Sequence, residues 1–290
     1  MIKKLKYENI DFDKYTQCLE NSQQKNWYAK KEVLDELSGN WEILVYRDYE
    51  AVLPIPLIKK FGIKFVITPL FCQQLGVFSS SDNSEINDQF LKALKKNYKI
   101  FYYSFNQHNS FSSSAEKRKN YIIPISDYEI LRRKKYFKGR KSTVKCAQHL
   151  IYKEIELNTK HISFIENNFK GLTKENDIKK FKDYLNFLDR NNSLKLFAAY
   201  LDQQLINIAI LVSEKTEFSL LALINDEAYK KEDGASFLID KILSHYIHKK
   251  SFNFMGSNIP GIERFFKSFG AELHDYNFIQ NKILKKIYKI

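Results

Sequence analysis

Hydrophobic residues in the C-terminal half of the chain recur with the two periods that distinguish strands from helices. Residues 194–214 form two apolar runs that turn at Asp202-Gln203, and a third run follows at 217–224, which predicts a three-stranded meander. With the neighbouring segments, this half is predicted to follow the order β-α-α-β-β-β-α-β-α-β. The other predicted elements are a strand at 150–157, helices at 159–170, 174–190 and 234–249, a strand at 251–255, a helix at 259–269 and one or two strands within 272–290.

The N-terminal half also mixes strands and helices. A hairpin is predicted to turn at residues 47–50, with Pro54 and Pro56 placing its second strand at an edge or a bulge, because proline cannot donate a hydrogen bond within a sheet. The remaining predicted elements are strands at 2–7, 99–105 and 120–125 and helices at 28–37 and 85–96. The predicted fold class is therefore α/β, with mixed sheets flanked by helices.

The length of 290 residues favours two domains, since one domain usually takes ~150 residues. We predict a first domain at 1–126, a connecting helix at 127–149 and a second domain at 150–290. The connecting helix is rich in cations, which belong either to a solvated helix or to an anion-binding patch. These cations include Arg132, Arg133, Lys138, Arg140, Lys141 and Lys145.

A seven-residue spacing runs through this connecting helix. Ile130, Phe137, Val144 and Ile151 each follow the previous one by seven positions, which predicts one narrow apolar stripe on an otherwise basic surface. Gly139 is expected to bend or interrupt the helix.

The composition narrows the class of protein. A formal net charge of +13 favours a polyanionic partner, but lysine, asparagine and isoleucine are all abundant, a bias that weakens this inference. No run approaches eighteen apolar residues and the N-terminus lacks a signal-peptide core, so we expect a cytoplasmic protein with no membrane span. Three scattered cysteines, and a His245–His248 pair with no third ligand, predict no metal site.

The segment FNFMGSNIPGIERFFKSFGAE, residues 252–272, concentrates three of the chain's nine glycines. Pro260 and Gly270 fit the first turn and the C-terminal end of a helix. Gly256 and Ser257 fall between a buried strand and that helix, where α/β sheets bind ligands. Ser257 is therefore either a helix cap or part of a binding site.

A second small-residue segment begins the preceding helix. Lys231, Gly234, Ala235 and Ser236 follow a strand and a loop, an arrangement that suits phosphate binding by backbone amides. The alternative is an ordinary capped helix start.

The motif of residues 252–272 resembles the signature of Fem-type proteins, a tandem-GNAT family of N-acyltransferases that includes peptidoglycan interpeptide-bridge aminoacyltransferases. FKGRKSTVKCA is similar to the basic segment that precedes their second domain, and PLFCQQLGVF and FNQHN resemble first-domain elements. This chain departs from the pattern at Asn253, where the family often has aspartate, and at Lys231 and Ser236 in the phosphate loop. It also lacks a long helical-hairpin insertion.

The resemblance implies two tandem GNAT-like domains and transfer of an acyl or aminoacyl group from an activated ester or thioester to an amine held between the domains. It implies acyl-CoA or aminoacyl-tRNA as co-substrate, and a small molecule or a cell-envelope amine as acceptor. Backbone N–H groups at 220–224 and 252–255 are expected to hold the acyl carbonyl. The sequence does not indicate whether the protein is a monomer or an oligomer.

Candidate site residues follow from the motifs and the resemblance. The general base could be His108, Glu272 or Asp275. The catalytic candidates are Ser257, Asn253 and His108; the donor-binding candidates are Lys231, Gly234, Ala235, Ser236 and Gly256; the substrate-binding candidates are Gln73, Gln74, Asn106, Asn109, Arg140, Lys141, Arg264 and Lys267.

Two other functions are compatible with the sequence. A CoA-dependent acetyltransferase is favoured if residues 231–236 bind a nucleotide. A catalytically silent module that binds polyanions or RNA is favoured if the cations at 132–145 are its main feature.

Overall fold

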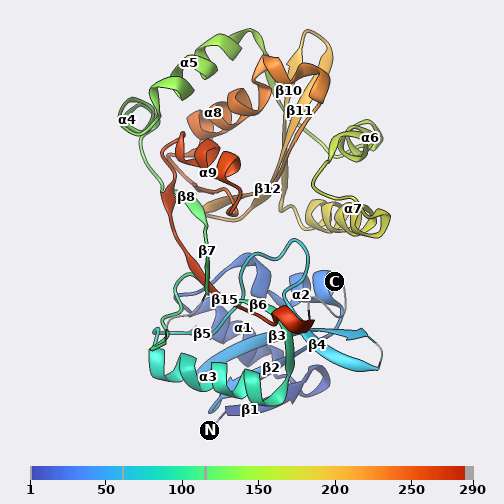
Figure 1. Cartoon of the computed structure of the whole chain (residues 1–290), viewed down its shortest axis with the longest axis vertical. Helices are drawn as coiled ribbons and strands as arrows, with labels where there is room; N and C mark the ends of the chain where they lie inside the picture. The colour runs from blue at the N-terminus through green and yellow to red at the C-terminus, as the bar shows by residue number, and fades with distance from the viewer. Residues whose placement is uncertain (1, 61, 114–115, 285–290) are drawn as a thin grey trace. The chain divides into compact units, whose positions relative to one another are not determined.

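The computed structural model describes residues 2–60, 62–113 and 116–284 (Figure 1). The chain divides into two compact units: Met1–Arg118 with Asp275–Ile290, and Lys119–His274. This division differs from the predicted one, because the last strand joins the first unit and the segment at 127–149 belongs to the second. Hydrophobic periodicity identifies strands but not their partners, so the sequence pattern could not place these boundaries.

The first unit is built on one mixed sheet. Its strands follow the order β1-β2-β3-β4-β6-β15-β7, β5 also pairs with β3, and only β4 and β6 pair in parallel. The elements are β1 (Ile2–Lys6), α1 (Phe12–Glu20), α2 (Lys31–Ser38), β2 (Trp41–Tyr46), β3 (Ala51–Lys60), β4 (Ile63–Ile67), β5 (Phe78–Ser79), α3 (Ser84–Asn97), β6 (Lys99–Ser104), β7 (Glu116–Arg118) and β15 (Tyr276–Gln280).

The predicted hairpin between β2 and β3 is confirmed, since Tyr46 pairs with Ala51 across the turn. The expected edge position of β3 is wrong, because β3 lies inside the sheet. On one side it pairs with β2 throughout residues 51–56; on the other it pairs with β5 at 51–52 and with β4 at 57–60. Pro54 and Pro56 fall in the interval between these two partners, where a missing N–H group costs no strand pairing.

A buried carboxylate joins several strands of the first sheet. Glu42 in β2 is 3% exposed, and its two oxygens lie 2.8 Å from Lys4 Nζ and 3.2 Å from Lys64 Nζ. Tyr98 donates its hydroxyl to the same carboxylate at 2.9 Å. Burial disfavours the ion, but the hydrogen bonds from Lys4, Tyr98 and Lys64 outweigh it and lower the pKa of Glu42.

The second unit has the predicted order of strands and helices, preceded by one strand from residues 119–126. Its sheet follows the order β14-β8-β13-β12-β11-β10-β9, and only β12 and β13 pair in parallel. The elements are β8 (Tyr121–Ile123), α4 (Tyr128–Lys134), α5 (Lys138–Cys146), β9 (Ile151–Ile155), α6 (Thr159–Asn168), α7 (Glu175–Arg190), β10 (Leu194–Leu201), β11 (Gln204–Ser213), β12 (Glu217–Asn225), α8 (Gly234–Tyr246), β13 (Ser251–Asn253), α9 (Pro260–Lys267) and β14 (Glu272–Leu273).

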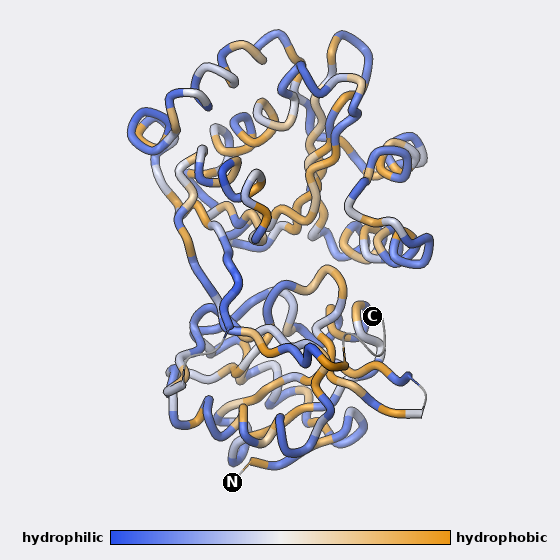
Figure 2. The backbone as a smooth tube through the Cα atoms, viewed as in Figure 1, coloured by the Kyte–Doolittle hydropathy of each residue, from blue (hydrophilic) through white to orange (hydrophobic). Residues whose placement is uncertain are grey.

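Helices cover both faces of this sheet (Figure 1). Helix α8 contacts β10, β11 and β12, and α6 and α7 contact β12 and β10 from the opposite face. The strands β10 to β12 are largely hydrophobic (Figure 2), as expected for strands buried on both faces.

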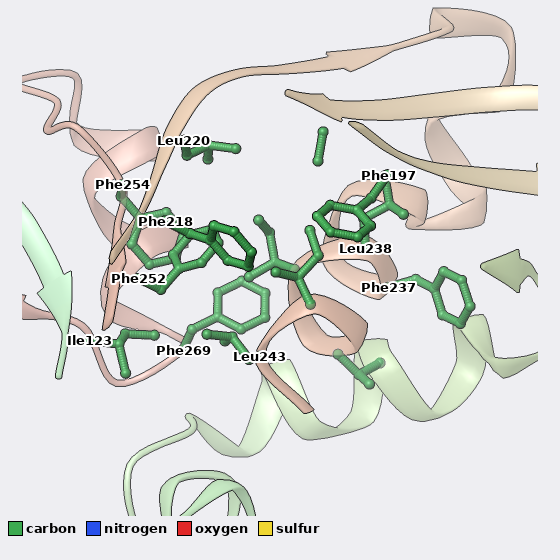
Figure 3. Packing of buried hydrophobic residues seen from close by; sticks show 14 of the residues in the cluster. Ile123, Phe197, Phe218, Leu220, Phe237, Leu238, Leu243, Phe252, Phe254 and Phe269 are labelled. Carbon is green, nitrogen blue, oxygen red and sulfur yellow. The ribbon is translucent and has the colours of Figure 1, made fainter. Parts of the chain in front are cut away.

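The core between the sheet and α8 combines aliphatic side chains with a group of aromatic rings. Phe218, Phe252, Phe254 and Phe269 are each at most 2% exposed and lie in one cluster (Figure 3). Burying each such ring contributes about 2–3 kcal/mol. This core fixes the ends of β12 and β13 in place.

The predicted connecting helix is two helices, α4 and α5, separated at residues 135–137. The helix is interrupted at these residues and not at Gly139, which lies in the first turn of α5. The predicted apolar stripe is also wrong: Val144 is buried, but Ile130 and Phe137 are each 49% exposed. Because the helix is interrupted and Ile151 belongs to β9, a seven-residue spacing no longer marks one face. The buried apolar side chains of α4, α5 and the link between them are Leu131, Tyr136 and Val144.

Candidate active site

The strands β12 and β13 part from one another soon after they begin. They pair in parallel only from Glu217–Ser251 to Ser219–Asn253, while β12 continues to Asn225. Beyond β13 the chain follows β8 instead, since the Phe254 N–H donates to the Tyr121 carbonyl at 2.9 Å. Among the described residues, the edge of β12 after Ser219 therefore has no strand partner on this side.

A β-bulge accompanies this divergence. Ile210 pairs with Ala222 and Leu211 with Leu220, so Leu221 is an extra residue in β12. A bulge bends its strand and increases the local twist. The side chains of Leu220 and Phe254 turn into the core (Figure 3).

Asn253 connects the end of β13 to the start of β12. Its Nδ2 donates to Glu217 Oε1 at 3.1 Å, and its Oδ1 accepts the Met255 N–H at 2.9 Å. The same carboxylate accepts hydrogen bonds from Ser219 at 2.9 Å and Ser251 at 3.4 Å. The amide of this candidate catalytic residue is thus fixed in orientation by its two partners.

A left-handed turn follows Asn253. Met255 has φ 56° and Gly256 has φ 75°, and a non-glycine residue adopts such an angle only when its surroundings hold it there. The hydrogen bond from Met255 to Asn253 supplies that restraint. Gly256 is therefore explained by the backbone conformation that the turn requires.

Ser257 lies directly after this turn. Its Oγ accepts the Ile259 N–H at 3.0 Å, so it restrains the chain before α9. The predicted capping role is wrong, because the N-cap residue of α9 is Ile259 and no side chain caps this helix. No described histidine or carboxylate is hydrogen-bonded to this hydroxyl, which therefore lacks the base that a nucleophilic serine needs.

The start of α8 holds the second group of candidates. Gly234 lies against β11: a Cβ added there would approach Asn207 Oδ1 to 1.8 Å. Asn207 in turn donates to Asn225 on β12. The glycine is thus required by the packing of α8 against β11, a cause that neither the phosphate-binding interpretation nor the capped-start alternative predicted. Asp233, in a left-handed conformation, makes no side-chain cap, so it leaves the first amides of α8 uncapped.

Arg140 brings α5 to the start of α8. Its guanidinium donates to Ser236 through Nη1 and to Ser268 through Nε at 2.9 Å, and it lies 4.6 Å from the ring centre of Phe265. Burial lowers the pKa of Arg140, and Asp233 partly offsets this effect. Arg140 and Ser236, predicted separately, therefore meet at one positively charged position.

The other predicted cations of this unit lie on the surface. Lys231 and Arg264 are exposed, whereas Lys141 Nζ donates to the Arg133 carbonyl at 2.7 Å. Lys267 is paired with Glu263 at 2.6 Å, so part of its charge is neutralised. Ala235 lies half-buried next to Ser236.

Glu263 in the first turn of α9 is the centre of an ion-pair cluster. Hydrogen bonds from Lys119 and Lys267, together with the nearby Tyr121 hydroxyl, lower its pKa to about 2. Burial, and to a lesser degree this carboxylate, raises the pKa of Tyr121 to about 12. Neither group is suited to exchange a proton near neutral pH.

The predicted substrate-binding amides of the first unit serve loop backbone. Asn109 accepts the Val77 N–H at 3.0 Å and donates to the Val77 carbonyl at 2.8 Å. Asn106 accepts the His108 N–H at 2.9 Å, and Gln74 accepts the Gln107 N–H at 2.7 Å. The structure assigns these amides to loop packing, and their binding of a substrate stays a prediction.

The remaining candidates of the first unit are Gln73 and His108. Gln73 is buried and accepts from the Gln74 side chain at 3.3 Å. The His108 ring is exposed and lies 3.2 Å from the Gln107 amide nitrogen. As for the other candidate bases, Glu272 pairs with Lys135 at 3.0 Å and Asp275 with Lys117 at 3.2 Å.

Sequence reasoning missed Glu217, Ser268 and Asn207. Each contacts a predicted residue that is distant in the sequence. Ser268 lies within the motif of residues 252–272, but no motif surrounds Glu217 or Asn207. The pairing of β12 with β13 brings Glu217 to Asn253, whereas Ser268 and Asn207 meet Arg140 on α5 and Gly234 on α8 through helix packing.

Two further searches of the described residues gave negative results. No group of His, Cys, Asp or Glu side chains in residues 2–60, 62–113 and 116–284 could hold a metal ion. In the same ranges, none of the helices combines the length and apolar character needed to cross a membrane.

Comparison with known proteins identifies the fold. No family model and no curated protein matches the sequence. FemX superposes with a TM-score of 0.64 over 99% of this chain and 100% of that one, at 11% identity. A tandem GNAT protein from the clavulanic acid biosynthesis pathway gives 0.54 over 96% and 97%, at 9% identity. L-PGS from Bacillus licheniformis gives 0.52 over 96% and 94%, at 11% identity. The chain therefore has the tandem GNAT fold that its motifs predicted, and in structure it is similar to FemX.

Proposed function

We propose that the chain is an N-acyltransferase that moves an acyl or aminoacyl group from an activated ester or thioester to an amine. The observation that carries the proposal is the early divergence of β12 from β13 in a chain with the tandem GNAT fold. The open edge of β12 can offer backbone N–H groups to a carbonyl oxygen. The turn at Met255 and Gly256, held by Asn253, directly follows β13.

The proposed reaction depends on alignment and on stabilisation of negative charge. The amine nitrogen attacks the carbonyl carbon and forms the C–N bond, while the carbonyl electron pair moves onto oxygen. That pair then returns as the bond to the oxygen or sulfur leaving group breaks, and the proton lost by nitrogen ends on the leaving group. A backbone donor to the oxyanion contributes about 3–4 kcal/mol to such a step.

Arg140 and the start of α8 are the proposed binding site for the donor. Uncapped amides and a half-buried guanidinium attract a negatively charged group. The diphosphate of an acyl-CoA and the phosphodiester backbone of an aminoacyl-tRNA share this chemistry. Ser257 directly follows the turn at Met255 and Gly256, and its hydroxyl is the candidate for passing the proton to the leaving group.

Binding experiments test the proposal and separate the donors. The melting temperature of the full chain is measured with acetyl-CoA, longer acyl-CoAs, aminoacyl-tRNA or uncharged tRNA. In a separate assay, the protein is incubated with each donor and a set of amines, and acylated products are sought by mass spectrometry. A donor at 100 times its Kd should stabilise the native state by about 2.7 kcal/mol. Equal shifts with charged and uncharged tRNA, and no acylated product with any donor, would support the silent binding module instead.

Replacing Arg140 tests the donor site directly. Arg140→Met should weaken donor binding by about 10- to 100-fold, because a hydrogen bond to a charged group is worth about 1.5–3 kcal/mol. Arg190→Met, on an exposed part of α7, is the matched control and should bind normally. Urea unfolding of both variants shows whether they remain folded. Normal donor affinity in a folded Arg140→Met protein would remove this site from the proposal.

A further inference from the structure

The net charge of the chain is concentrated in one short segment. Residues 129–146, which include α4 and α5, hold eight Lys or Arg residues and a single acidic residue, Glu129. Their net charge of seven is more than half of the +13 of the whole chain. A general lysine bias would spread this charge along the sequence, so the segment is a local cationic surface.

Large apolar side chains are exposed within the same segment. Ile130 on α4 and Phe137 before α5 are each 49% exposed, although seven-residue spacing predicted both as inward-facing. The exposed cations Arg133 and Lys134 lie one turn from Ile130 on α4, and Lys138 follows Phe137 directly. Cations and large apolar side chains on one short segment are the combination that suits a partner with both a negative charge and an apolar layer.

The segment is held in place by the rest of its unit. The Phe137 N–H donates to the Ser268 carbonyl at 3.0 Å, and Lys135 pairs with Glu272 at 3.0 Å. Lys141 joins α5 to α4 through the Arg133 carbonyl. The exposed side chains are therefore presented by an ordered surface.

We propose that residues 129–146 form a docking surface for an anionic lipid bilayer. The cations attract anionic headgroups, and Ile130 and Phe137 enter the boundary between headgroups and acyl chains. A nucleic-acid partner is the weaker match, because Ile130 has no ring on which a base can stack. Across the second unit, six of the seven large apolar side chains exposed by 40% or more are Ile or Leu, and Phe137 is the only aromatic one.

Vesicle binding by the full chain tests this surface. The protein is sedimented with vesicles of phosphatidylcholine alone or with 30% phosphatidylglycerol, at low and high salt. Binding should require the anionic lipid and fall with salt. The triple substitution Lys134→Gln, Lys138→Gln and Lys145→Gln should weaken it roughly a hundredfold, since each cation near an anionic surface contributes about fivefold. Ile130→Ser with Phe137→Ser should weaken binding to the anionic vesicles while every charge is kept.

Matched controls use exposed residues elsewhere. Lys92, Lys95 and Lys96 on α3 replaced by Gln control for charge, and Leu70→Ser, at a side chain 42% exposed, controls for apolar loss. The proposal is overturned if anionic vesicles do not bind, or if the Ile130 and Phe137 variant binds them like the parent. It is also overturned if single-stranded RNA binds and lipid does not. None of the substituted residues belongs to the proposed donor site, so loss of vesicle binding leaves acyl transfer intact and the two proposals fail independently. RNA binding without lipid binding would instead favour the silent RNA-binding module.

Discussion

Asn253 occupies the position where the similar Fem-type motif often has aspartate, and its neighbour Glu217 gives a physical reason for the difference. Asn253 Nδ2 donates to Glu217 Oε1 at 3.1 Å. In Asn253→Asp, a carboxylate oxygen would replace this donor and face the Glu217 carboxylate. The other carboxylate oxygen of Asp could still accept the hydrogen bond from the Met255 N–H, so the turn would be kept. The substitution therefore tests the contact with Glu217.

The expected loss of stability follows from this contact. Two unit charges about 4 Å apart repel by about 4 kcal/mol at an effective dielectric constant near 20. The protein can avoid this repulsion by keeping one proton on the pair at pH 7. Protonating a carboxyl group of ordinary pKa, about 3.9, at pH 7 costs about 4 kcal/mol, because each pH unit above the pKa adds about 1.36 kcal/mol. Since Glu217 is only half-buried and can shift, we expect Asn253→Asp to lower the free energy of unfolding by about 2–4 kcal/mol.

The pH dependence of this loss has a definite sign. A proton on either carboxyl group removes the repulsion, so the native variant binds that proton more tightly than the unfolded chain does. Stability relative to the parent should therefore fall as pH rises. The loss should be complete at pH 7 and should disappear as pH approaches about 4.

Urea unfolding between pH 4 and pH 7.5 measures these effects in four proteins: the parent, Asn253→Asp, Glu217→Gln and the double variant. The double variant exchanges the positions of the carboxylate and the amide, so it should recover at least about 2 kcal/mol of the loss at pH 7. The reasoning fails if Asn253→Asp is as stable as the parent at pH 7, or if Glu217→Gln does not rescue it.

Three more substitutions test packing in the second unit and electrostatics in the first. Gly270→Ala should destabilise the protein by about 2–4 kcal/mol in urea unfolding, because Gly270 has φ 81° and an added Cβ would lie 2.4 Å from Lys135 Cβ. Gly139→Ala, in α5 with no heavy atom within 4 Å, should instead stabilise by up to about 1 kcal/mol; equal effects of the two would contradict the packing argument. Glu42→Gln should cost about 1–3 kcal/mol at pH 7, because the buried side chain would lose its charge-assisted hydrogen bonds from the half-exposed Lys4 and Lys64. Since the folded-state pKa of Glu42 is lowered, the parent loses this contribution as pH falls below about 4.5, and the two proteins should converge in acid; a constant difference across pH would refute this role.

Local patterns in the sequence predicted most of the elements but not their partners. The meander of β10 to β12 and the hairpin of β2 and β3 follow from apolar runs separated by short turns, and both are confirmed. The position of β15 in the first sheet could not be predicted, because its pairing with β6 depends on residues far away in the sequence. The stripe at 130–151 failed for a related reason: the break at 135–137 is stabilised by contacts with α9 and β14.

Glycines were good markers of special backbone but weak markers of function. Gly270 adopts the left-handed conformation that its position at a helix end indicated, and Gly256, predicted as part of a binding site, is left-handed as well. Gly234 has a different cause, since Asn207 on β11 fills the space that a side chain would need. A sequence shows that a glycine is placed unusually, but the neighbour that requires it is visible only once the strands are paired.

The location of β15 has a consequence for how the protein is made. This strand lies between β6 and β7, so the first sheet lacks an internal member until residues 276–280 leave the ribosome. Residues 119–274, by contrast, form one uninterrupted stretch of chain. During synthesis, the part that is translated first must wait for its final strand, and the inserted part is free to fold before it.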